Sequence, residues 1–351
     1  MNISALTLSV SFLKSFLMPE TLTEETLVAQ LLAGSKRACG RLISLVENES
    51  PGYLEALKAI YPHAENAPDS SASGSDAGYI IGVTGPPGSG KSTLVDKLAK
   101  QLTDSGEKTG IVAVDPTSPF TNGAILGDRI RMDSVSGSGN TFIRSMGTRG
   151  HLGGISRATA DVLVILSAFG CRYIFVETVG VGQSEMDIVK CADTVLMVLA
   201  PGLGDDIQAL KAGVMEIGDV FAVNKADREG AEKTCRETRA MLDFKSDWDF
   251  KPPVCLTMAE SGEGVDILME NILAHKNFLL DSGKLAERRR RKKAAHIKGI
   301  VSDRLDRRIE MHIEDMILSY KEMFNNGHDF AGDPYSLAEI IINQINSQNK
   351  I

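Results

Sequence analysis

The stretch that decides the fold is GPPGSGKST, which runs from Gly85 to Thr93. It follows the apolar run YIIGVT and precedes the helix-like segment LVDKLAKQL. The full pattern G-x-x-x-x-G-K-[ST] between a strand and a helix is a phosphate-binding P-loop, in which glycines let backbone N–H groups approach phosphate oxygens. We therefore expect nucleotide contacts from the whole loop: Gly85, Pro86, Pro87, Gly88, Ser89, Gly90, Lys91, Ser92 and Thr93.

The last residues of the loop are expected to contact the phosphates and the metal ion. A helix that begins near Lys91 points the positive end of its dipole at the same phosphate oxygens. The Lys91 ammonium is expected to bridge the β- and γ-phosphates, and the Ser92 hydroxyl to ligate Mg²⁺. The loop thus predicts a nucleoside triphosphate and Mg²⁺ as ligands.

Outward from the loop, the pattern strand, turn and helix repeats. Short apolar runs occur at YIIGVT, GIVAVD, TFIRSM, YIFVET, TVLMVLA and VFAVN. Continuous apolar runs are typical of central parallel strands, which are buried on both faces. Helices are expected at Ser92–Leu102, Gly154–Phe169, Asp206–Met215 and Ala231–Leu242. We predict an α/β fold of the P-loop NTPase type with a doubly wound, mostly parallel sheet and ligands at the carboxyl ends of its strands.

The flanking regions differ from this pattern. We expect five parts: a frayed or disordered terminus over 1–20, N-terminal helices over 21–61, a linker over 62–78, the P-loop domain over 79–281, and a C-terminal helical part over 282–351. Thr21 and Glu24 have the spacing of a capping box, and apolar residues then repeat with helical periodicity to about Ala59. The segment Pro62–Gly78 is rich in Pro, Ser, Ala and Gly, a composition that buries little apolar surface.

The C-terminal part opens with the basic run ERRRRKK, from Glu287 to Lys293. Apolar residues with helical spacing follow it, which predicts one long amphipathic helix to about Phe324, then a loop and a short helix from Ser336. We interpret the basic run as a solvated helix face. A docking surface for an acidic partner or a second subunit is the alternative.

The motif NKAD, from Asn224 to Asp227, follows the strand VFAV and indicates the base. Asp227 can accept hydrogen bonds from the ring N1–H and the exocyclic amine of guanine. Adenine offers neither donor there, so a buried Asp227 would be left unpaired. A site that bonds a specific polar group rejects analogues that lack it by about 10⁴-fold or more. Asn224 would tie this loop to the P-loop, and the Lys225 stem would lie across the base. The sequence therefore predicts GTP and GDP rather than ATP.

Acidic residues near other strand ends are candidates for metal and water chemistry. Glu177, in the motif ETVG, could hold Mg²⁺ through a water or activate one, and Gly180 could sense the γ-phosphate through its backbone N–H. Asp115 and Asp128 could both face the phosphates, with an N-cap or surface carboxylate as the alternative for each. The expected metal site is thus Ser92, Asp115 and Glu177, and the expected catalytic residues are Lys91, Asp115, Asp128 and Glu177.

Water positioning is incomplete in this sequence. No Gln follows Gly180 directly, and the nearest is Gln183, so we expect slow unaided hydrolysis that a partner could accelerate. Candidates for stabilising transition-state charge are Arg129, Arg131, Arg144 and Arg149. His151 could be catalytic, structural or a surface residue.

Composition excludes some classes of function. The net charge of −8 and a pI near 5.4 argue against a general nucleic-acid binder, which needs excess Lys and Arg to neutralise phosphates. The five cysteines form no CxxC pair, so neither a zinc site nor a disulfide framework is indicated, and free thiols suit a reducing compartment. No segment is expected to cross a membrane.

These motifs together resemble one family, the MeaB/ArgK group of P-loop GTPases that chaperone cobalamin-dependent acyl-CoA mutases. The matching segments are GPPGSGKST, VDPTSPFTNGAILGDRIRM, MGTRGHLGG, ETVGVGQSE, PGLGDDIQALKAG and NKAD, in this order between about Gly82 and Asp227. The helical flanks fit as well, so the resemblance covers nearly everything after Met18. Thr117, where Ser is expected, is a slight departure.

The resemblance implies a partner and an assembly. Members of this group are usually homodimers in which the C-terminal helices form a dimerisation arm. They bind methylmalonyl-CoA mutase or a close relative, and GTP binding and hydrolysis gate delivery of adenosylcobalamin and exchange of damaged cofactor. A cytoplasmic location is expected, because no transit peptide is recognisable.

The resemblance also implies an additional switch in the segment Leu203–Gly213, which would sense the mutase and stimulate hydrolysis. Its coupling residues would be Asp205, Asp206, Gln208 and Lys211. The alternative is an ordinary loop and helix start, with Asp205 or Asp206 as N-cap.

Three other functions remain open at this stage. The first is a kinase or ATPase linked to periplasmic lysine/arginine/ornithine transport, although the NKAD loop argues against ATP as donor. The second is a related metallochaperone GTPase, although six His and five Cys are dispersed and form no tract beside a switch. The third is a GTP-dependent scaffold without useful turnover.

Overall fold

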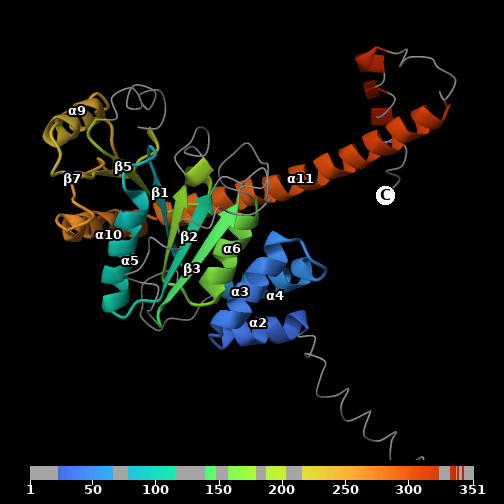
Figure 1. Cartoon of the computed structure of the whole chain (residues 1–351), viewed down its shortest axis with the longest axis horizontal. Helices are drawn as coiled ribbons and strands as arrows, with labels where there is room; N and C mark the ends of the chain where they lie inside the picture. The colour runs from blue at the N-terminus through green and yellow to red at the C-terminus, as the bar shows by residue number, and fades with distance from the viewer. Residues whose placement is uncertain are drawn as a thin grey trace, which may run out of the picture. The chain divides into compact units, whose positions relative to one another are not determined.

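The computed structural model describes residues 23–65, 78–115, 139–147, 157–178, 187–202, 216–323, 333–336, 338–339 and 342–343. The chain divides into two compact units, and the division falls between Arg289 and Arg290. The boundary expected from the sequence pattern, between residues 281 and 282, stays a prediction. Figure 1 shows the elements of both units.

The first unit is built on a sheet of parallel strands. In the described part of the chain these are β1 (Tyr79–Thr84), β2 (Thr109–Asp115), β3 (Thr141–Gly147), β4 (Tyr173–Thr178), β5 (Thr194–Leu199), β6 (Val220–Val223) and β7 (Val254–Leu256). Their order is β3-β2-β4-β1-β5-β6-β7, with every pairing parallel. The strand that leads into the P-loop thus lies in the middle, and all carboxyl ends meet at one edge of the sheet. The predicted fold class is confirmed.

Both faces of the sheet are covered, as the continuous apolar runs predicted. In β2, Val112 and Val114 pack with one cluster, while Ile111, the residue before Val112, packs with the other. This alternation follows from the two-residue period of a strand. Strands β4, β5 and β6 are buried along their whole length, which leaves the chemistry to the loops at their ends.

The helices form the two outer layers (Figure 1). On one face lie α5 (Lys91–Asp104) and α10 (Val265–Asp281), whose leucines pack on β1 and β5. On the other face lies α6 (Arg157–Ala168), which packs on β2 and β4. The helix α9 (Ala231–Asp243) packs beside β6 and β7.

Within residues 23–65, the described part before the sheet, the helices are α2 (Glu24–Leu32), α3 (Lys36–Glu47) and α4 (Tyr53–Glu65). Of these, α3 and α4 pack against α6. The N-cap of α2 is Thr23, whose hydroxyl accepts from the Thr26 N–H at 3.4 Å, so the predicted start at Thr21 is wrong by two residues. The helix α4 continues past Ala59 and includes Pro62, because Ile60 and Ala64 are buried against the core. The end of this helix overlaps the linker expected over 62–78, and residues 66–77 lie outside the described part of the chain.

Among the described residues, three elements were not predicted from the pattern: the strand β7, the helix α10 and the short 3₁₀ helix η2 (Ile188–Lys190). The strand β7 has three residues and follows Pro252 and Pro253, which made it look like a loop. The helix α10 lies between Leu242 and the basic run, where the sequence pattern predicted no helix. The predicted helix over Asp206–Met215 lies outside the described residues, whereas the other three predicted helices of the sheet domain are present with small shifts of their ends.

The long helix expected at the C-terminus is present as α11 (Lys284–Met323). Its first turns belong to the first unit, where Leu285 joins the core under the sheet. Helical turns also occur at 334–336, 338–339 and 342–343. Among the described residues, none of the helices combines the length and apolar character needed to span a bilayer.

Candidate nucleotide site

The loop between β1 and α5 has a backbone that only glycine fits at key points. Gly85 has φ of +138°, and a Cβ there would lie 2.1 Å from the Val198 carbonyl oxygen. Gly90 has φ of +92°, and its Cβ would lie 2.3 Å from Asn224 Nδ2. Gly88 also has a positive φ, of +74°. These conformations turn the loop tightly around the carboxyl end of β1, as a phosphate cradle requires.

The first turn of α5 is open for an anion. Gly90 is the N-cap residue and provides no side-chain hydrogen bond to the first N–H groups of the helix. These groups, together with the positive end of the helix dipole, favour negative charge at this position. No acidic side chain lies in the first turn of α5, so nothing within that turn competes with a phosphate.

Lys91 is held inside the loop. Its side chain is buried, and Nζ donates to the carbonyl oxygens of Gly85 at 2.8 Å and Pro86 at 3.1 Å. These contacts fold the ammonium over the loop, at the centre of the predicted cradle. The same loop leaves Pro87 and Gly88 exposed and Ser92 and Thr93 half-buried, so a ligand can reach it from solvent.

Ser92 meets the carboxylate that the ETVG motif pointed to. Ser92 Oγ donates to Glu177 Oε1 at 2.6 Å, and Glu177 is buried at the end of β4. One residue on, Thr178 Oγ1 donates to Thr84 Oγ1 at 3.0 Å and ties the end of β4 to the end of β1. The structure thus brings two of the three predicted metal ligands together.

This pair suits Mg²⁺, which takes oxygen ligands and is usually held by one or two protein groups together with phosphates and water. A hydroxyl and a carboxylate 2.6 Å apart beside the P-loop offer that donor set. Among the described residues no group of three or more His, Cys, Asp and Glu could hold a metal by itself. The third predicted ligand, Asp115, ends β2 beside Gly147, and its side chain lies outside what the structure describes.

The NKAD segment packs directly on the P-loop, as expected for Asn224. Asn224 is 2% exposed, and its Nδ2 donates to the Ser89 carbonyl at 2.9 Å. Lys225 reaches across the same gap, because its Nζ donates to the Gly88 carbonyl at 2.6 Å. Lys225 has φ of +58°, a left-handed conformation that non-glycine residues rarely adopt outside functional sites. Asp227 is exposed in the chain without nucleotide, not buried as expected from the sequence, so a ligand can reach it.

A third loop, which sequence reasoning missed, completes this arrangement. The Oδ1 atom of Asn224 accepts from the Ala259 N–H at 3.0 Å and from Thr257 Oγ1 at 3.3 Å. In addition, the Ala226 N–H donates to the Thr257 carbonyl at 3.0 Å. The loop after β7 therefore fixes the predicted base loop. The only sequence feature that marked the loop after β7 was the short apolar run VCL directly before Thr257.

Several predicted site residues lie outside the described part of the chain: Asp128, Gly180, Asp205, Asp206, Gln208 and Lys211, and also Arg129, Arg131, Arg149, His151 and Gln183. The fourth arginine candidate is placed, and it is not at the site. Arg144 lies within β3 at the edge of the sheet, where its guanidinium pairs with Glu47 and donates to Ser44 Oγ at 3.1 Å. The structure thus removes Arg144 from the candidates for transition-state stabilisation.

Comparisons with known proteins agree with this geometry. Residues 39–314 match the family described as methylmalonyl Co-A mutase-associated GTPase MeaB. A protein of Pyrococcus horikoshii classed as a GTPase is 48% identical over 325 residues, covering 92% of this chain and 98% of that protein. GTPase ArgK of Escherichia coli is 33% identical over 270 residues, covering 74% of this chain and 78% of that protein. The crystal structure of an LAO/AO transport system kinase shares the fold, with a TM-score of 0.67 and 22% identity over 94% of this chain and 99% of that one.

Proposed function

The chain belongs to the MeaB/ArgK family of P-loop GTPases, and we propose that it is a GTP-hydrolysing chaperone of a cobalamin-dependent acyl-CoA mutase. In this proposal GTP binding and hydrolysis gate the loading and protection of adenosylcobalamin on a mutase of the methylmalonyl-CoA type. The observation that carries it is the match over residues 39–314 to a family named for its association with that mutase. The P-loop and NKAD geometry supplies the nucleotide chemistry that such gating needs.

The described residues have distinct roles in this proposal. Lys91 leaves the carbonyls of Gly85 and Pro86 to bridge the β- and γ-phosphates, while the loop N–H groups hold the remaining oxygens. Ser92 and Glu177 hold Mg²⁺, with Asp115 as the third predicted ligand. The metal, when bound, neutralises charge on the phosphates. Glu177 can alternatively position the attacking water.

The base is read by the loops after β6 and β7. Asp227 accepts from the guanine N1–H and exocyclic amine, and the Lys225 stem covers the ring. Asn224 holds the base loop against the P-loop through Ser89 and against the loop after β7 through Ala259. These bonds fix the distance between the loop that would hold the base and the loop that would hold the phosphates. A site of fixed geometry favours binding of a guanine nucleotide.

The switch parts of the proposal concern residues outside the described chain. We propose that Gly180 senses the γ-phosphate and that Asp128 positions water. The coupling residues Asp205, Asp206, Gln208 and Lys211 would transmit docking of the mutase. Loss of the γ-phosphate removes the charge around which such segments are organised, so that a partner docked on them meets a different surface.

The test is single-turnover GTP hydrolysis by the purified chain, alone and with methylmalonyl-CoA mutase. We expect slow hydrolysis alone and acceleration of about tenfold or more when the mutase completes the site. Lys91→Ala is the matched control, because it should remove nucleotide binding or turnover and with it any stimulation. Equal rates with and without the mutase would contradict the chaperone role while leaving the GTPase assignment intact.

We also propose that the chain forms a homodimer through α11. Its apolar side chains Ile297, Val301, Leu305 and Ile309 recur at every fourth position and are between 39% and 54% exposed in the single chain. Covering such side chains stabilises an interface by about 1.5–3 kcal/mol each at full burial. Light scattering should give twice the mass of the chain, and Val301→Glu should give the single mass. A monomeric wild-type protein would refute the dimer.

A further inference from the structure

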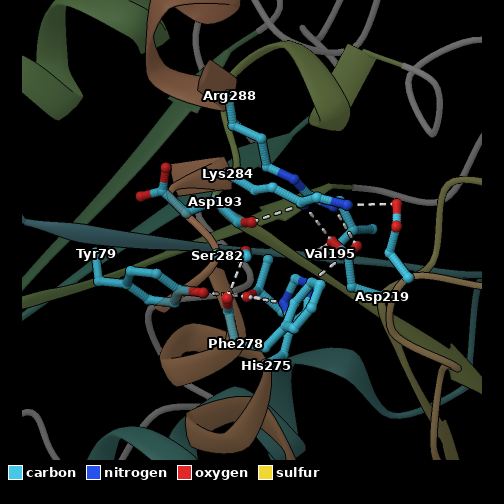
Figure 2. A network of polar contacts seen from close by, with 11 residues as sticks. Tyr79, Asp193, Val195, Asp219, His275, Phe278, Ser282, Lys284 and Arg288 are labelled. Carbon is cyan, nitrogen blue, oxygen red and sulfur yellow. Dashed lines mark hydrogen bonds and ion pairs between the residues drawn. The ribbon is translucent and has the colours of Figure 1, made fainter. Parts of the chain in front are cut away.

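A buried polar network lies at the amino ends of β1, β5 and β6, on the edge of the sheet opposite the nucleotide loops (Figure 2). Asp193 directly precedes β5, and its Oδ2 accepts from the Ile80 N–H of β1 at 2.9 Å. Asp219 directly precedes β6, and its Oδ2 accepts from the Val195 N–H of β5 at 2.9 Å. Each carboxylate thus adds one bond between its own strand and the next.

Two consecutive arginines of α11 hold these two carboxylates. Arg288 makes a two-pronged contact with Asp219, from NH1 to Oδ2 at 2.8 Å and from NH2 to Oδ1 at 2.7 Å, and NH1 also donates to the Asp193 carbonyl at 2.8 Å. Arg289 pairs with the Asp193 carboxylate at 3.6 Å. We call these four residues the arginine clamp. Such forked contacts fix orientation as well as distance, and burial strengthens them.

His275 of α10 extends the network under the sheet. Its Nε2 lies 3.3 Å from Asp219 Oδ1, and its Nδ1 lies 2.7 Å from Thr194 Oγ1, which in turn contacts the Tyr79 hydroxyl at 2.5 Å. Burial lowers the pKa of His275 to about 4, so the ring is neutral near pH 7. With Nε2–H donating to Asp219, Nδ1 accepts from Thr194. This row is not a hydrolase triad, because Thr194 is fully buried and no substrate can reach it.

Two of the clamped strands, β1 and β6, lead into the nucleotide loops. β1 starts at Tyr79 and leads into Gly85 of the P-loop. β6 has only four residues, all buried, between Asp219 at one end and Asn224 at the other. A short strand packed on both faces shifts as a unit, because a close-packed interior does not deform continuously.

Nucleotide binding can shift these strands by changing the contacts that Lys91 makes at the carboxyl end of β1. Lys91 now holds the carbonyls of Gly85 and Pro86, and phosphates compete for the same ammonium. We propose that the arginine clamp couples nucleotide binding at the carboxyl ends of β1 and β6 to the first turns of α11. Arg289, the last residue of the arginine clamp in the chain, is also the last residue of the first unit. The first turns of α11 therefore respond to the state of the nucleotide site. This inference rests on the proposed nucleotide site.

Hydrogen exchange on the full chain tests the coupling, with and without a saturating non-hydrolysable GTP analogue. In the wild type we expect the analogue to change exchange of the backbone amides over residues 284–296 by about fivefold or more, the lower range of measured couplings. Arg288→Lys keeps the charge but loses the forked contact, and should reduce this response to less than half. The same variant should also bind the analogue with altered affinity, because a coupling free energy acts in both directions.

The control is Arg290→Lys, which changes the exposed residue two positions along the same basic run and should behave like the wild type. Unchanged exchange of the backbone amides over residues 284–296 of the wild type on binding the analogue would overturn the coupling without any variant. So would a full response in Arg288→Lys. Failure of the wild type to bind the analogue would instead refute the proposed nucleotide site, so the two failures are distinguishable.

Discussion

The sharpest single perturbation of the site is Asn224→Ala. The side chain is 2% exposed and joins three loops through Ser89, Thr257 and Ala259. Truncation leaves the Ser89 carbonyl and the Ala259 N–H without this partner in a buried place. Each such group costs about 1–3 kcal/mol, so we expect the free energy of unfolding to fall by roughly 3 kcal/mol.

Binding should weaken as well, because the same bonds fix the distance between the predicted base loop and the P-loop. If about half of the lost energy appears in binding, the affinity for GTP falls roughly tenfold, since 1.4 kcal/mol corresponds to a factor of ten. Urea unfolding gives the stability, and titration with a fluorescent GTP analogue below the unfolding transition gives the affinity.

The matched control is Thr257→Val, which removes only the 3.3 Å hydroxyl contact with Asn224 and keeps the volume. It should lower stability by about 1 kcal/mol and leave affinity nearly unchanged. An Asn224→Ala protein that loses stability yet binds GTP as tightly as the wild type would refute the reasoning. The Asn224 bonds would then support the fold alone.

Three further predictions follow from the same geometry. Gly85→Ala should remove GTP binding, because its Cβ would lie 2.1 Å from the Val198 carbonyl; wild-type affinity by calorimetry would contradict the cradle. Asp227→Asn should weaken guanine preference, so an unaltered GTP, ITP and XTP profile would count against base reading. His275 has a pKa of about 4 in the fold and 6.5 as its ordinary value, so the unfolded chain takes up its proton first and stability falls as pH drops from about 6.5 to 4. This loss, up to about 3 kcal/mol relative to His275→Gln, is measurable by urea unfolding, and parallel pH profiles of the two proteins would exclude it.

Most of the fold could be predicted from sequence because parallel strands that are buried on both faces have continuous apolar sequences. The same rule fails for β7, whose three residues after two prolines carry too little pattern. The P-loop was predictable because the spacing of Gly85, Gly90, Lys91 and Ser92 between a strand and a helix is specific to phosphate binding. Thr257 and Ala259 were not, because their contact with Asn224 depends on which loops the strand order brings together.

The basic run shows the same limit. ERRRRKK was interpreted as a solvated helix face, and for Arg288 and Arg289 that interpretation is wrong, since both are partly buried against Asp219 and Asp193. Both aspartates directly precede apolar strand runs, so their position was readable. Their pairing with α11 was not, because it joins residues 69 and 96 positions apart.

The most direct test of guanine specificity is the relative affinity of the wild-type chain for GTP and ATP, measured by calorimetry with Mg²⁺ present. We predict that the chain binds GTP about 10⁴-fold or more tightly than ATP, because adenine leaves Asp227 without either donor. ATP binding as tight as GTP binding would contradict this prediction.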